Sequence, residues 1–82
     1  DQNYPNPFNP ITKIKFSVPY FSQISITIYD VRGNLVKKLV NEDYEPGNYV
    51  INVNAQDYAS GMYFYKLENG QESHVKKFML IK

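Results

Sequence analysis

The sequence of 82 residues contains no cysteine and no tryptophan, and it has one histidine and four glycines. Without cysteine, the protein forms neither a disulfide bond nor a thiolate metal site. The glycines stand singly, so a glycine-rich phosphate-binding loop is excluded. No apolar run approaches the ~20 residues that cross a membrane as a helix. The sequence therefore predicts a domain without disulfides, without a nucleotide-binding loop and without a membrane span.

A charge excess of either sign is also lacking, because nine basic side chains stand against eight acidic ones and leave a net charge of +1. A nucleic-acid partner needs clustered positive charge, so we expect none. The first residues have neither the basic start nor the apolar stretch of a signal peptide. A chain of this length makes a single domain. We therefore expect residues 1–82 to be one module excised from a longer protein.

β-branched and aromatic residues dominate the composition. Seven isoleucines, seven valines, eight tyrosines and five phenylalanines stand against two alanines and four leucines, which favours strands over helices. Apolar and polar residues alternate along several short runs, as they do in half-buried strands. The expected strands are 13–18, 23–29, 34–40, 49–54, 62–68 and about 73–82. This spacing predicts an all-β fold, a small antiparallel immunoglobulin-like β-sandwich of about seven strands.

The alternation also assigns side chains to faces of the strands. We expect inward-facing side chains at Ile14, Phe16, Val18, Ile24, Ile26, Ile28, Leu35, Leu39, Tyr63, Tyr65 and Leu67. Two further sets share one face each, namely Tyr49 with Ile51 and Val53, and Phe78 with Leu80. The order of residues 36–39 disturbs strict alternation, so we expect a β-bulge there.

Turn residues separate the expected strands. The Asp30 carboxylate can accept hydrogen bonds from the amides that follow it, while Gly33 adopts a positive φ. Residues 41–48 are expected to form a polar loop, in which Pro46-Gly47 fits the centre of a type II turn. Asn69-Gly70 is a strong hairpin signal and predicts a type I′ turn.

Three of the five prolines lie in the opening run of residues 3–10. Because proline fixes φ and removes a backbone donor, we expect residues 1–10 to be an extended or turned segment ahead of a sandwich formed by residues 11–82. Tyr4 and Phe8 are large apolar side chains within this run. We expect them to pack against the sandwich and to close one end of its core.

Residues with catalytic potential are few. Glu72, Ser73 and His74 are neighbours on one expected strand, and adjacent strand residues point to opposite faces, so a Ser–His–acid triad does not converge there. The spacing of a calcium-binding loop is absent among the acidic residues Asp30, Glu42, Asp43, Glu45 and Asp57. We therefore expect no catalytic residue, no metal and no cofactor, and we do not expect an enzyme.

Aromatic side chains and lysines leave other functions open. Exposed tyrosines can stack on carbohydrate, although cross-strand packing is their commoner use. The aromatic candidates are Tyr20, Phe21, Tyr29, Tyr44 and Tyr58. Lysines on the last strand have two possible roles. They either prevent aggregation through the sheet edge, which is a routine use of edge lysines, or form a charged recognition element.

Five segments together resemble the type A C-terminal sorting domain of the type IX secretion system. Residues 28–33, with Tyr29, Asp30 and Gly33, look like the central hairpin of that family, and Pro46-Gly47 matches its loop glycine. Residues 60–67, with Gly61, Tyr63 and Tyr65, are similar to its aromatic strand, and residues 76–82 to its terminal lysine-and-aliphatic signature. The opening run resembles the start of that family's sequence pattern, through Tyr4, Pro5, Asn6, Pro7, Phe8, Asn9 and Pro10. The resemblance covers essentially the whole chain in the right order.

The resemblance implies an immunoglobulin-like domain at the C-terminus of an exported protein of the Bacteroidetes and related phyla. Such a domain targets the upstream cargo in the same chain across the outer membrane. The implied partners are the type IX machinery, with its shuttle or receptor, and a sortase-like protease. The implied location is the periplasm in transit, then the cell surface or the medium. The alternative is an immunoglobulin-like structural or carbohydrate-binding accessory module, including a relative of the flagellar hook-capping protein.

A folded domain presents only its exposed edges and termini to a receptor. We therefore hypothesise that the last strand carries recognition, because a free strand edge supports strand addition. The residues assigned to this role are Lys76, Lys77, Phe78, Leu80 and Lys82.

Overall fold

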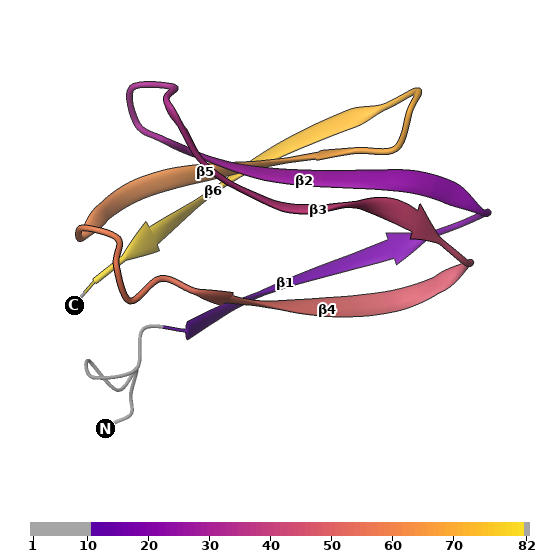
Figure 1. Ribbon diagram of the computed structural model, residues 1–82, viewed down its shortest axis with the longest axis horizontal. Helices are drawn as coiled ribbons and strands as arrows, with labels where there is room; N and C mark the ends of the chain where they lie inside the picture. Colours follow the sequence, from indigo (N-terminus) through magenta and orange to yellow (C-terminus); the bar gives the residue numbers. More distant parts are fainter. Residues whose placement is uncertain (1–10, 82) are drawn as a thin grey trace.

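The computed structural model describes residues 11–81, with side chains from Lys13 onward, and in this range it contains strands and no helix (Figure 1). The strands are β1 (Ile11–Val18), β2 (Ser22–Asp30), β3 (Leu35–Tyr44), β4 (Gly47–Asn54), β5 (Gly61–Glu68) and β6 (Ser73–Leu80). The all-β sandwich prediction is confirmed, but the described residues form six strands rather than about seven. The segment between β4 and β5 adds no strand. The immunoglobulin-like topology stays a prediction.

The six strands form two antiparallel sheets. β1 pairs with β4 in a small sheet, and the larger sheet has the order β3-β2-β5-β6. Two hairpins, β2–β3 and β5–β6, make up the larger sheet and are joined by the pairing of β2 with β5. The chain changes sheet at residues 19–21, 45–46 and 55–60. No helix in the described range could cross a membrane.

The core lies between the inner faces of the two sheets. β2 contributes three almost completely buried isoleucines at alternate positions, and β1 contributes three apolar side chains with the same spacing. This confirms the predicted alternation in both strands, since a strand with one buried face repeats every two residues. The buried core consists of Ile14, Phe16, Val18, Ile24, Ile26, Ile28, Val40, Val53, Ala55, Tyr63 and Leu80.

β3 differs from its prediction in length and in facing. It continues to Tyr44, through residues predicted as polar loop, because residues 41–44 pair with residues 22–25 of β2. The predicted bulge is confirmed, since the pairing with β2 shifts twice within residues 35–40. Each shift inserts an extra residue and alters the facing of those beyond it. Two shifts cancel, and Leu35, five residues from the inward-facing Val40, pairs with Tyr29 on the outer face. It is 61% exposed there, and its predicted inward position is wrong.

Two of the predicted turns have a different geometry. Gly47 begins β4 with a φ of +154°, far from the about +80° that a type II turn requires, so that prediction is wrong. The β5–β6 hairpin is confirmed, but the Asn69 amide donates to the Glu72 carbonyl at 3.1 Å. The two residues inside this turn are therefore Gly70 and Gln71, one position later than predicted.

The turn between β2 and β3 has the predicted chemistry. Asp30 Oδ1 accepts hydrogen bonds from the amides of Arg32 and Asn34, each at 2.9 Å. Asn34 Nδ2 donates to Asp30 Oδ2 at 3.2 Å, and Gly33 has a φ of +88°. These bonds, above all the one from the Asn34 amide, hold the pKa of Asp30 below its usual value of 3.8.

One aromatic cluster extends the core beside β1. The Phe16 ring lies 5.4 Å from Tyr44 and 5.5 Å from Tyr49, and the Tyr49 hydroxyl donates to the Glu45 carbonyl at 2.6 Å. This cluster packs where the chain passes from β3 to β4. It therefore stabilises one of the three connections between the sheets.

A second aromatic cluster lies at β5 and β6. The Tyr63 ring is 5.7 Å from Tyr58 and 5.6 Å from Phe78. The Tyr63 hydroxyl donates to the Ala59 carbonyl at 2.6 Å, whereas the buried Tyr58 hydroxyl has no hydrogen-bond partner within the described part of the chain. Burial raises the pKa of Tyr58 above its usual value of 10.0.

Replacing Tyr58 by phenylalanine should stabilise the protein. The change removes a buried, unpaired hydroxyl, whose burial costs about 1–3 kcal/mol, so we expect Tyr58→Phe to raise the free energy of unfolding in urea by about 1 kcal/mol. Tyr63→Phe is the matched control, because it removes a paired hydroxyl and should lower stability by about the same amount. Equal losses in both variants would contradict the expectation and indicate a partner for Tyr58.

The Asp30 turn should make stability depend on pH in a defined direction. A carboxyl whose folded pKa lies below its unfolded value stabilises the fold above the unfolded pKa, and this contribution is lost as pH falls through the folded pKa. The stability difference between the wild type and Asp30→Ala should therefore be present at neutral pH and narrow below about pH 3.8. Urea unfolding across this range measures it. Asp30→Asn is the control, because it keeps an acceptor oxygen without the charge. A stability difference between the wild type and Asp30→Ala that stays constant with pH would show that the charge of Asp30 does not stabilise the turn.

Candidate recognition surface

β6, the strand that the sequence assigns to recognition, is an outer strand of the larger sheet. It pairs with β5 from Ser73 to Leu80 and with no other strand in the described range. Its other edge therefore presents backbone amides and carbonyls without a strand partner. Four of the proposed recognition residues, Lys76, Lys77, Phe78 and Leu80, lie on β6. The fifth, Lys82, lies outside the described residues.

Phe78 and Leu80 face the inside of the sandwich. The Phe78 ring stacks on Tyr63 and lies 6.3 Å from the Tyr65 ring. Leu80 belongs to the buried core and is only 6% exposed. Both side chains therefore anchor β6, and a partner that docks on the folded domain does not reach Leu80.

Lys76 and Lys77 are exposed, on opposite faces of the sheet. Lys76 pairs with the inward-facing Tyr65 and Lys77 with Phe64 on the other side, and directly paired residues share a face. The two ammonium groups therefore lie on either side of the free β6 edge. A partner strand added to that edge would have a positive charge above it and another below it.

The other family-motif residues support local structure where they are described. Asp30 and Gly33 form the β2–β3 turn, and Gly61 begins β5 with a φ of +152°. Tyr63 and Tyr65 face inward as predicted, and Tyr63 is buried. The motif residues that lie outside the described range are Tyr4, Pro5, Asn6, Pro7, Phe8, Asn9 and Pro10.

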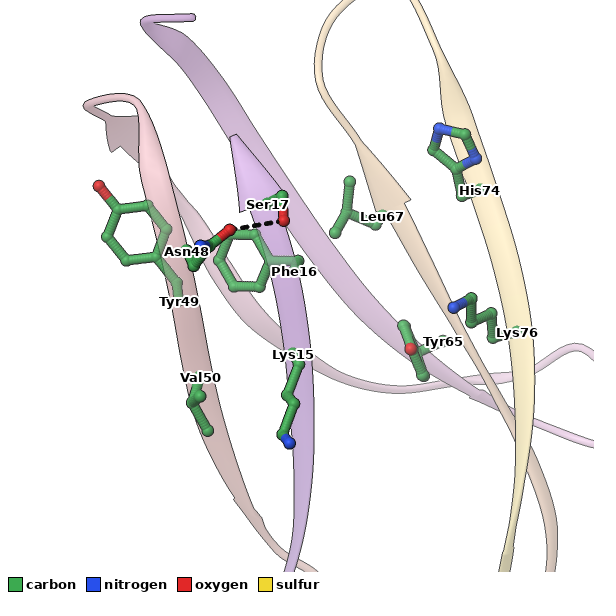
Figure 2. A pocket seen from close by; sticks show the side chains of 10 residues that line it. All are labelled: Lys15, Phe16, Ser17, Asn48, Tyr49, Val50, Tyr65, Leu67, His74 and Lys76. Carbon is green, nitrogen blue, oxygen red and sulfur yellow. Dashed lines mark hydrogen bonds between the residues drawn. The ribbon is translucent and has the colours of Figure 1, made fainter. Parts of the chain in front are cut away.

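A groove between the two sheets was not predicted from the sequence. It has a volume of about 540 Å³ and lies between β1 and β4 on one side and β5 and β6 on the other (Figure 2). Its apolar lining includes Tyr49, Tyr65 and Leu67, and its cationic lining includes Lys15 and Lys76. Alternation predicted that Tyr65 and Leu67 face inward. It carries no information on whether the opposite sheet is wide enough to cover them.

The residues weighed for catalysis and metal binding do not converge. His74 Nε2 lies 3.5 Å from Glu72 Oε1, and both side chains are exposed, while Ser73 occupies the opposite face of the strand. Among the described residues, no three His, Asp or Glu side chains gather closely enough to hold a metal ion. Asp30 is engaged in its own turn.

The aromatic candidates for carbohydrate stacking lie in three places, and Tyr29 is half-buried on the outer face of β2, where it pairs with Leu35. Tyr44 and Tyr58 pack in the aromatic clusters of the core. Tyr20 and Phe21 are exposed and lie in the β1–β2 connection. A stacking platform requires several exposed rings on one surface, so Tyr44 and Tyr58 are poorly placed for that role.

Comparison with protein families gives a match over nearly the whole chain. A family model described as secretion system C-terminal sorting domain matches residues 2–82, a range that includes all six strands. No curated protein and no solved structure matches the chain. The match confirms the family resemblance read from the five sequence segments.

Truncating β6 side chains should separate those that anchor the strand from those that it displays. Leu80→Ala should lower the free energy of unfolding by about 2–5 kcal/mol, because it leaves a cavity in the core. Lys77→Ala should change it by less than about 0.5 kcal/mol, since the side chain is exposed. Urea unfolding measures both. A loss in Lys77→Ala comparable with that in Leu80→Ala would contradict this division.

Proposed function

This chain belongs to the C-terminal sorting domain family of the type IX secretion system, and we propose that it directs an upstream cargo in the same polypeptide across the outer membrane. Membership of the family supports a secreted protein and an interaction with the secretion machinery. The proposed route runs through the periplasm to the cell surface or the medium. The proposed partners are a shuttle or receptor of that machinery and a sortase-like protease that acts on the exported protein.

We propose that the machinery reads the free edge of β6 together with Lys76 and Lys77. The supporting observation is that β6 is held on the sheet by Phe78 and Leu80 while its other edge has no strand partner in the described range. Strand addition supplies main-chain hydrogen bonds, and flanking side chains supply specificity. The two lysines add charge on both sides of this edge.

The proposed function is non-catalytic. A catalytic site needs a nucleophile, a base and a stabilising group that converge in one place. The His74–Glu72 pair is exposed on an outer strand, and we assign it no chemical step. The domain acts through binding alone.

Secretion of a fluorescent fusion tests the role of the β6 edge. A fluorescent protein carrying residues 1–82 at its C-terminus, behind an inner-membrane export signal, should reach the medium or cell surface of a host with a type IX system. The double variant Lys76→Ala/Lys77→Ala should be exported severalfold less and should accumulate in the periplasm. Point variants are preferable to deleting residues 78–82, because that deletion removes Phe78 and Leu80 from the packed interior.

The matched control is Lys37→Ala/Lys38→Ala on β3, which removes the same charge from the opposite side of the larger sheet. This control should be exported like the parent fusion. Equal export of both double variants would overturn the role of the β6 lysines. Equal export of the fluorescent protein with and without residues 1–82 would overturn the sorting function itself.

A further inference from the structure

The inner face of the larger sheet changes from buried to open as it approaches β6. One row of directly paired residues runs from Ile28 through Tyr65 to Lys76, and the next runs from Ile26 through Leu67 to His74. Paired residues share a face, so all six side chains point to the interior side. Both isoleucines are fully buried, Tyr65 and Leu67 are half-buried, and Lys76 and His74 are exposed.

The small sheet explains this gradient, because it has two strands in the described part of the chain. β1 pairs with β4 on one side, and no described strand pairs with its other side. The groove begins at that side of β1, and Figure 2 shows Tyr65, Leu67 and Lys76 pointing into the space between β1 and β6. A third strand beside β1 would occupy this space.

The spacing of the groove side chains suits an extended peptide. Tyr65 and Leu67 are two residues apart on one strand and present apolar surface at alternate positions. Alternate side chains of an added strand repeat with the same period. Main-chain hydrogen bonds to β1 would position such a strand, and its inward-facing side chains would cover Tyr65 and Leu67.

The charges around the groove favour an acidic partner. Lys15 stands on the β1 side and Lys76 on the β6 side, and no carboxylate is among the lining residues. The lining residue His74 has Glu72 beside it, with Nε2 and Oε1 3.5 Å apart. A second copy of β1 in this position would bring lysines against lysines, which is unfavourable. An outward-facing carboxylate of the added strand would instead share a face with Lys15, and a carboxylate at an inward-facing position beside the apolar side chains would face Lys76.

We propose that the groove binds an extended acidic segment of a partner protein, which adds to the free edge of β1 as a third strand of the small sheet. Apolar side chains at alternate positions of the segment lie on Tyr65 and Leu67. An outward-facing carboxylate of the segment pairs with Lys15, and an inward-facing carboxylate beside the apolar side chains pairs with Lys76. This site shares Lys76 with the proposed recognition surface, but it uses the edge of β1 rather than the outer edge of β6, and its test does not depend on secretion.

A defined peptide tests the proposal on the purified 82-residue chain. The probe is a blocked octapeptide with leucine at two alternate positions and glutamate at the remaining six, so that both faces carry carboxylates. It is titrated while amide NMR signals are recorded. We expect saturable shifts in residues 15–17, 65, 67 and 76, together with slower hydrogen exchange of β1 amides. Two control peptides should each bind at least about tenfold more weakly. A leucine–lysine peptide lacks the charge complementarity, and a serine–glutamate peptide lacks the apolar contact.

Charge reversal supplies the matched variants. Lys15→Glu/Lys76→Glu should weaken binding of the leucine–glutamate peptide by about tenfold or more, since two favourable charge pairs become repulsive. It should also gain affinity for the leucine–lysine peptide. Lys37→Glu/Lys38→Glu makes the same change in net charge on β3, away from the groove, and should bind like the wild type.

Several results would overturn the proposal. Absence of saturable binding by the leucine–glutamate peptide is one, and equal weakening in both charge-reversed variants is another. Shifts confined to the outer edge of β6 would assign the peptide to that edge instead. Protection of the β1 amides in the peptide-free chain would show that its edge is already occupied, by a second copy if the protection rises with protein concentration and by another part of the chain if it does not.

Discussion

The burial of the inner face of β2 is the constraint on which the rest of the structure depends. β2 is hydrogen-bonded on both sides, to β3 and β5, and Ile24, Ile26 and Ile28 are almost completely buried. Full burial of each such side chain is worth about 1.5–3 kcal/mol, which in a domain of this size is a large share of the stability. β1 supplies the cover with apolar side chains at the same period of two, and the chain must therefore change sheet between β1 and β2.

The cover extends only as far as the small sheet. Beyond β2, the inner face passes from buried isoleucines to half-buried Tyr65 and Leu67 and then to exposed Lys76. Phe78 and Leu80 hold the other end of β6 in the interior. β6 is therefore packed into the core at one end and exposed at the other. The surfaces suited to binding lie at the sheet edges that have no strand partner in the described range. This fits a family of sorting domains that belongs to a secretion system.

Alternation predicted β1 and β2 well, because each has one fully buried face. It failed in β3 for two reasons. Residues 41–44 are mostly polar but still form a strand, since an outer strand needs only backbone pairing with β2 and little apolar burial. Leu35 faces outward because Val40 faces inward, five residues away, and the two pairing shifts between them cancel in their effect on facing. The sequence indicated a bulge but not how many residues it inserts, and that number decides the facing.

The sequence by itself determined the all-β class, the buried isoleucines, the Asp30 turn and the family, because each of these rests on local pattern or on motif residues. Only the tertiary structure decided that the small sheet has two described strands, that β6 lies at the outside of the larger sheet, and that Lys15 and Lys76 flank one groove. These features depend on which strands pair and how far one sheet covers the other. Pairing joins residues such as Ile14 and Ile51 that are far apart in the chain, and a periodic pattern within one segment does not specify its partner.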